Sequence, residues 1–214
     1  GDRMVPRMMG PTAGGMIKQW CEAKGVRVFT GTRVEAIEAH APLKVRLSNG
    51  QSLEADLVIS ATGVKPAIGF LENSDIQCLQ GVLTDEHLQT SVRGIYAAGD
   101  CAEAFDIATG KPVVSAIQPN AAEQARVAAL NMVGRPTTLK GVTQINVLDT
   151  LGLISASFGQ WDGVPGGDHV ELTDQAANRH LSLQFSGDQL VGCNSVGWTE
   201  HVGVMRGLVE GGVK

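Results

Sequence analysis

The chain has 214 residues, a formal net charge of −5 and 43% hydrophobic residues, which is enough apolar material for a globular protein with a buried core. The acidic excess argues against nucleic acid or a membrane surface as a partner, because both attract clustered positive charge. No run approaches the roughly 18 apolar residues of a membrane helix, and the N-terminus lacks a signal-peptide pattern. We therefore expect a cytoplasmic protein.

The four cysteines lie far apart, with no C-x-x-C pair and no histidine at metal-ligand spacing. We interpret them as reduced, mostly structural thiols and expect no metal site. The 27 glycines indicate many tight turns and close backbone approaches, as a nucleotide-cofactor fold requires. The chain begins at Gly1 rather than Met, so we expect it to be a piece of a longer protein.

The first third of the chain predicts a helix followed by short strands. Gly25 ends the helix, and the pair Asn49-Gly50 predicts a tight turn. Residues 56–61 form an apolar run typical of a strand buried on both faces, and this run closes on a turn at Gly63. The expected elements are a helix at 9–24 and strands at 26–30, 33–40, 44–48 and 52–61.

An irregular, partly helical segment is expected at 66–81, before a short strand at 81–85. The next strand, 95–98, runs into Gly99 and Asp100, with small residues on both sides of the carboxylate. Because open α/β sheets bind ligands at the carboxyl ends of strands, Asp100 is a candidate binding residue. The alternative is an aspartate that only caps the following turn.

Residues 101–114 predict a loop or hairpin, and Pro119-Asn120 is expected to open an alanine-rich helix over 121–133. Its N-terminus would carry unpaired N–H groups and a partial positive charge, which suit an electron-rich carbonyl. An ordinary amphipathic surface helix is the alternative. The remainder predicts strands at 144–148, 153–158, 169–172, 179–185 and 189–195 and a helix from about 202 to 209.

The segment Ile95-Tyr96-Ala97-Ala98-Gly99-Asp100 resembles the second flavin motif of the FAD-dependent pyridine nucleotide-disulfide oxidoreductases. This resemblance implies that Asp100, beside Gly99, hydrogen-bonds the ribityl chain of FAD. Residues 117–124 resemble the family segment that runs beneath the flavin ring. By that match, the backbone at Asn120, Ala121 and Ala122 faces the pyrimidine end of the isoalloxazine, where a positive helix dipole would stabilise the reduced anion.

Residues 4–66 resemble the second half of the family's NAD-binding domain, with Ala61-Thr62-Gly63 as the turn where the NAD and FAD domains meet. Gly63 is then a candidate for close approach to the nicotinamide nucleotide, or a glycine needed only for turn geometry. The implied fold class is α/β plus α+β, part of a flavoprotein with two dinucleotide-binding domains. The implied domains are the C-terminal part of the NAD(P)-binding domain at 1–66, the C-terminal part of the FAD-binding domain at 67–138, and an antiparallel-sheet interface domain at 139–214.

Neither dinucleotide fingerprint is present, so FAD and NAD(P)H would both need residues outside this sequence. The glycine-rich stretch 10–15 has the wrong spacing, and Pro11 lacks an N–H for a phosphate. The His-x-x-x-x-Glu-Pro pattern of the glutathione-reductase-like branch is absent around His201, so we interpret His201 as a surface or core histidine. The resemblance is therefore to the NADH oxidases, rubredoxin reductases and nitrite reductase large subunits.

The leading hypothesis is a fragment of a flavin-dependent NAD(P)H oxidoreductase that forms a homodimer, with no catalytic residue assigned within this sequence. The choice between NADH and NADPH stays open, as does the electron acceptor. The alternative is a cofactor-free dimerisation or partner-docking module. A third hypothesis is a thiol-based redox sensor that uses Cys101, although a buried structural thiol is the commoner reason for such a cysteine.

Overall fold

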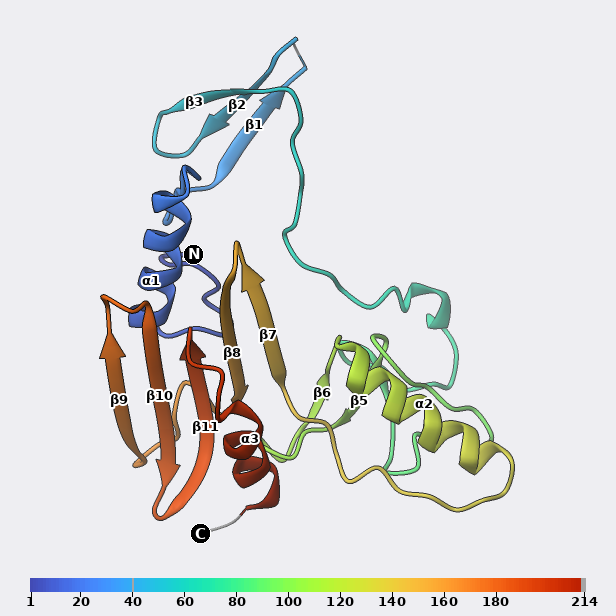
Figure 1. Ribbon diagram of the computed structural model, residues 1–214. Coiled ribbons are helices and arrows are strands. Elements are labelled where there is room, and N and C mark those ends of the chain that lie inside the picture. The colour runs from blue at the N-terminus through green and yellow to red at the C-terminus, as the bar shows by residue number, and fades with distance from the viewer. Residues whose placement is uncertain (40, 213–214) are drawn as a thin grey trace.

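The computed structural model describes residues 1–39 and 41–212 and shows a mixed α/β protein with three separate sheets (Figure 1). The helices are α1 (Pro11–Ala23), α2 (Gln118–Met132) and α3 (Val202–Gly211), with a 3-10 turn at Gly69–Leu71. The strands are β1 (Val34–Glu38), β2 (Leu43–Leu47), β3 (Ser52–Ala55), β4 (Val82–Leu83), β5 (Ala102–Phe105), β6 (Pro112–Val114), β7 (Ile145–Thr150), β8 (Leu153–Gly159), β9 (Asp168–Asp174), β10 (Arg179–Ser186) and β11 (Gln189–Val196). Among the described residues, no helix has the length and apolar content to cross a membrane.

Helix α1 begins with Pro11 in its first turn, where a backbone N–H would have no partner within the helix. It ends just before Gly25, as expected. Gly25 has a φ of 86°, and the N–H of Val26 donates to the carbonyl of Cys21 at 3.0 Å, which closes the C-terminus. The buried face of α1 packs against β8 and β11 through Ile17 and its neighbours. This contact joins the beginning of the chain to its end.

Strands β1, β2 and β3 form an antiparallel meander around the predicted turn at Asn49-Gly50. The predicted strand 26–30 is wrong, because it is not hydrogen-bonded into a sheet. The predicted strand 52–61 is confirmed only over 52–55, which is β3. The expectation that 56–61 is buried on both faces is also wrong, since Leu57 is 72% exposed and Ile59 is 79% exposed. An apolar run becomes a buried strand only where neighbouring strands cover it, and no described strand pairs with this one.

The sheet β4-β5-β6 holds the turn at Asp100 in place. Strand β4 pairs in parallel with β5, which follows that turn, and β5 and β6 form the expected hairpin. Glu103 is 3% exposed, and its carboxylate accepts hydrogen bonds from the backbone N–H groups of Gln80 and Gly81, the latter at 2.6 Å. The predicted strand 95–98 makes only a single bridge, between Tyr96 and Gln89.

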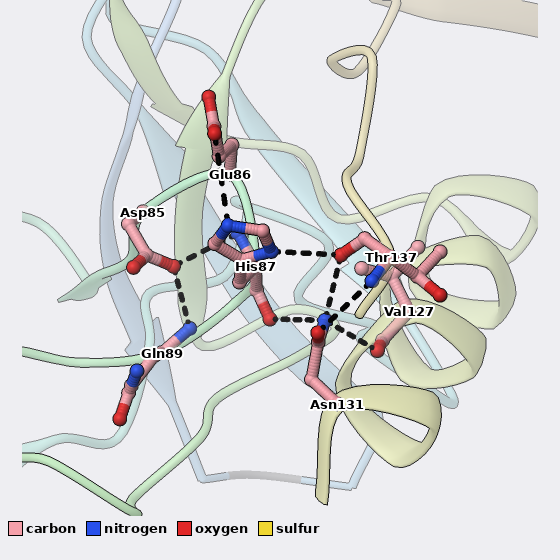
Figure 2. Close-up of polar contacts among 7 residues, drawn as sticks. All are labelled: Asp85, Glu86, His87, Gln89, Val127, Asn131 and Thr137. Carbon is pink, nitrogen blue, oxygen red and sulfur yellow. Dashed lines mark hydrogen bonds and ion pairs between the residues drawn. The ribbon is translucent and has the colours of Figure 1, made fainter. Parts of the chain in front are cut away.

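Figure 2 shows how the C-terminal end of α2 is fastened to the segment before Tyr96. The amide nitrogen of Asn131 lies within hydrogen-bond distance of the carbonyls of His87 (3.1 Å), Val127 (3.0 Å) and Thr137 (2.7 Å). The Oδ1 of Asn131 accepts from the N–H of Thr137 at 3.1 Å, and Asp85 accepts from two backbone N–H groups of the same loop. One side chain thus fixes where the helix sits relative to the preceding loop.

The C-terminal sheet has the order β7-β8-β11-β10-β9 and is antiparallel throughout. All five strands and α3 were predicted, with ends shifted by a few residues. Phe158 and Cys193 point to one face, where they pack with Val209 of α3. Leu153 and Val196 point to the opposite face, where they pack against α1.

Candidate functional site

A cavity of about 860 Å³ lies between the extended segment after Gly63 and the turn at Asp100. Gly63 and Asp100 both line it, although they come from separate parts of the chain. Arg7 reaches the same cavity from the loop before α1. The structure therefore brings together two of the predicted site residues and adds a cation that the sequence analysis did not assign.

Asp100 is exposed in this cavity, and its carboxylate has no hydrogen-bond partner within 1–39 or 41–212. The alternative role of capping the next turn is therefore not seen in the described structure. A free carboxylate at the end of such a segment can accept hydrogen bonds from ligand hydroxyl groups.

Gly99 gives the Asp100 turn its geometry. Its φ is 82°, a region that favours glycine, and a Cβ at this position would lie 3.7 Å from the Cβ of Ala121. The N–H of Gly99 donates to Oε1 of Gln124 at 2.7 Å, and Gln124 is fully buried. The sequence analysis assigned no role to Gln124. A glutamine on the buried side of an alanine-rich helix is the pattern that indicates such a hydrogen bond.

Helix α2 begins at Gln118, earlier than predicted, because Pro119 is well placed in a first helical turn. Asn120 does not face a ligand through its side chain, since its amide donates to Ser115 Oγ at 2.6 Å and to the Thr143 carbonyl at 3.0 Å. These bonds fix the start of α2 beside β6. Ala122 is exposed, Ala121 is half-buried, and no side chain caps the helix, so its N-terminal dipole is left to act on a neighbouring group.

Gly63 has a φ of 103°, in the region that favours glycine, but it lies in an extended segment rather than in the predicted turn. A Cβ added at Gly63 would lie 3.7 Å from Nη1 of Arg7. Arg7 makes no ion pair with any residue that the structure describes, so its charge is available to a ligand phosphate. Lys65 lines the same cavity and adds a second positive charge.

Cys101 also lines the cavity and is exposed, contrary to the expectation of a buried thiol. The contact of its Sγ is with the carbonyl of Ala98 at 3.7 Å, and no described histidine or lysine is hydrogen-bonded to it. His201 lies at the start of α3 and does not line this cavity. Cys101 is thus not paired with a base among the residues 1–39 and 41–212.

A sequence model of the family described as "Pyridine nucleotide-disulphide oxidoreductase" matches residues 1–129. The chain belongs to this family. Its members are oxidoreductases that depend on FAD and NAD(P)H, and the suspected membership is confirmed.

Relatives match nearly the whole chain. The NADH-dependent phenylglyoxylate dehydrogenase subunit epsilon of Aromatoleum evansii is 36% identical over 201 residues, which are 92% of this chain and 48% of the relative. The rubredoxin-NAD(+) reductase of Pseudomonas putida is 30% identical over 224 residues, which are 97% of this chain and 54% of the relative. The chain therefore spans about half the length of these two curated relatives.

Solved structures confirm the fold class. The NAD-dependent persulfide reductase from A. fulgidus has a TM-score of 0.87 and 26% identity, covering 99% of this chain and 43% of that chain. A ferredoxin reductase from Rhodopseudomonas palustris has a TM-score of 0.77 and 26% identity, and the match covers 91% of this chain and 48% of that chain. The arrangement of α1, α2 and the three sheets is thus that of a known oxidoreductase fold.

Asp100 lines the cavity, whereas Gly99, Asn120, Ala121 and Ala122 do not. Together, the Asp100 carboxylate and the neighbouring groups fit part of a flavin nucleotide. The Asp100 carboxylate is unpartnered in the described chain, Gly99 keeps the turn free of a side chain, and the uncapped start of α2 lies beside that turn through Ala121. A hydroxyl-bearing chain and a flat, electron-rich ring are complementary to these groups. The described residues provide no glycine-rich turn for a pyrophosphate.

Proposed function

We propose that the chain forms part of a flavin-dependent NAD(P)H oxidoreductase and that the cavity between Gly63 and Asp100 is where FAD and the nicotinamide nucleotide meet. The observation that carries this proposal is that the two predicted cofactor turns line one cavity. When bound, the two cofactors supply hydride transfer from NAD(P)H to the flavin and onward electron transfer to an acceptor. The protein contributes binding, orientation and electrostatics.

In this assignment, Asp100 and Gly99 hold the ribityl chain, and the backbone from Asn120 to Ala122 lies near the pyrimidine end of the flavin ring. The positive end of α2 stabilises negative charge that develops there. Gly63 permits close approach of the nicotinamide nucleotide, with Arg7 beside it for a phosphate. The exposed edge strands and α3 of residues 139–214 would form a homodimer interface, and residues 1–66 and 67–138 would be parts of the NAD(P)- and FAD-binding domains.

Flavin binding by the full-length protein tests the proposal. The purified protein should show flavin absorbance bands, and NAD(P)H should bleach them in the absence of oxygen. Asp100→Ala should weaken FAD binding by about 10- to 100-fold, because a hydrogen bond to a charged group contributes about 1.5–3 kcal/mol.

The control for this variant is Asp188→Ala, in the exposed turn between β10 and β11, which should leave the affinity for FAD unchanged. A protein that stays colourless after FAD addition, or an Asp100→Ala variant with wild-type affinity, would overturn the assignment.

A second candidate, a cofactor-free docking module, is favoured by the exposed apolar side chains along the segment from Leu57 to Phe70. Leu57, Ile59, Val64 and Phe70 are each more than 70% exposed. Such a segment is suited to pairing with another polypeptide segment. Stoichiometric FAD retained by the 214-residue chain alone would exclude this candidate.

A further inference from the structure

Glu103 is a buried carboxylate to which the flavin assignment gives no function. Its side chain is 3% exposed, and it lies on β5, directly after the turn at Asp100. No lysine, arginine or histidine within 1–39 and 41–212 forms an ion pair with it. A glutamate is almost never fully buried unless it is paired, so a buried carboxylate without a cation at this position requires an explanation.

Two backbone N–H groups take the place of a cation. Those of Gln80 and Gly81 both donate to Oε1 of Glu103, the latter at 2.6 Å. Such converging N–H dipoles suit a carboxylate, but they carry no net charge. The other oxygen, Oε2, makes no hydrogen bond with the described residues. The negative charge of Glu103 is therefore fixed in position without being neutralised.

Glu103 lies on the side of its sheet that faces the cavity at Asp100. Its cross-strand neighbour on β6 is Val114, and residues that oppose each other across two strands share a face. Val114 lines the cavity, as does Gln80, whose N–H binds the Glu103 carboxylate. Ala104 points to the opposite face, where it packs with Val127 of α2. The carboxylate is thus one hydrogen bond behind the cavity wall.

A fixed charge behind this wall acts on the electrostatics of whatever the cavity binds. Reduction of a flavin to its anion adds negative charge to the ring, and a nearby carboxylate repels that charge. Because Glu103 is buried, water and salt screen its charge less than they screen an exposed carboxylate. The repulsion opposes the stabilisation that the positive end of α2 gives to the same anion.

We infer that Glu103 lowers the reduction potential of a flavin bound at this cavity, an inference that rests on the proposed function. Glu103 acts through its charge across the cavity wall and takes no part in bond making or breaking. Because a lower potential favours the oxidised flavin, the reduced flavin passes its electrons more readily to the acceptor. Glu103 is then the counterweight to the helix dipole of α2.

Potentiometric titration of the full-length protein with bound FAD, followed through the flavin absorbance, tests this inference. Glu103→Gln keeps an oxygen for the N–H groups of Gln80 and Gly81 but removes the charge. It should shift the equilibrium about tenfold toward reduced flavin, which is about 30 mV for a two-electron couple.

Two further variants separate the charge from its surroundings. Glu103→Asp keeps the charge and shortens the side chain, so it should retain most of the wild-type equilibrium. Glu86→Gln removes an exposed, screened charge from the loop after β4 and should leave the equilibrium unchanged. Flavin absorbance retained by each variant shows that it is folded.

A Glu103→Gln variant that retains FAD with the wild-type potential would overturn the inference and leave the flavin assignment standing. A shift in Glu103→Asp as large as that in Glu103→Gln would trace the effect to geometry and would also overturn the inference. Loss of FAD from Glu103→Gln would show a purely structural role, with the same consequence. A wild-type protein that stays colourless after FAD addition would overturn the proposed function and this inference together.

Discussion

The backbone N–H of Gly99 donates to the side-chain oxygen of Gln124 at 2.7 Å, so a buried residue of α2 holds the turn that presents Asp100. The Nε2 of Gln124 is buried without a described partner. The Gln124 side chain thus has one oxygen in a favourable hydrogen bond and one buried nitrogen that lacks an acceptor. Position 124 links the packing of the helix to the geometry of the candidate site.

Gln124→Leu should weaken FAD binding by about tenfold while lowering the free energy of unfolding by only about 1 kcal/mol. The lost acceptor leaves the Gly99 N–H unsatisfied, but the change also removes the buried unpartnered nitrogen. Flavin titration and urea denaturation measure the two effects. Gln19→Leu, on the exposed side of α1, is the control, and a larger effect on stability than on FAD affinity would contradict a positioning role.

Gly81→Ala should destabilise the protein by about 2 kcal/mol or more, because a Cβ there would lie 2.5 Å from the Cys101 carbonyl and 3.0 Å from Val114 Cγ2. The matched change Gly15→Ala, inside α1 with no atom within 4 Å, should instead stabilise by about 0.5–1 kcal/mol. Denaturant midpoints measure both. Equal effects of the two substitutions would show that the close approach at Gly81 is not tight.

His180 should make the protein less stable as the pH falls from about 7 to about 5. Burial lowers the pKa of this imidazole, while the charge of Glu171 opposes that shift. Arg3, Arg7 and Asp162 line a cavity together with His180. The unfolded chain, with a histidine pKa of about 6.5, then binds more protons than the folded one, so stability present above that pH is lost below it.

His180→Gln should therefore reduce the loss of unfolding free energy over this pH range, whereas His169→Gln, at an exposed position on β9, should not. Urea denaturation at the two pH values provides the measurement. An identical pH dependence in wild type and His180→Gln would show that this histidine is not held neutral by burial.

Cys101 should be alkylated by iodoacetamide in the folded protein well before Cys193. Cys101 is exposed, whereas burial raises the pKa of Cys193 to about 12, so that the reactive thiolate is scarce at neutral pH. Mass spectrometry of the labelled peptides measures the order, and unfolding in urea should abolish the difference. Wild-type electron transfer by Cys101→Ser would exclude the redox-sensor hypothesis.

The C-terminal sheet was predictable because its pattern is local. Its strands alternate between faces, and turns such as Ser186-Gly187-Asp188 separate neighbours that pair with each other. The turn at Asp100 was likewise recognisable from consecutive small residues. These features depend on short stretches of sequence, so they can be predicted without knowledge of the rest of the fold.

The remaining features depend on distant neighbours. Residues 56–61 have the composition of a buried strand, but burial requires flanking strands that the described residues do not supply. Gln124 and Arg7 acquire their positions at the cavity only when α2 packs beside Gly99 and the loop before α1 reaches Gly63. No periodicity in a single sequence specifies such contacts.

The packing of α1 on the C-terminal sheet also has a consequence for synthesis on the ribosome. Met8 and Asn194, which share a hydrogen bond in that contact, are 186 residues apart. At typical translation rates, this separation corresponds to on the order of ten to forty seconds. The apolar face of α1 is without its partner in the C-terminal sheet for that time, so residues 11–23 are a target for chaperones that shield nascent apolar segments.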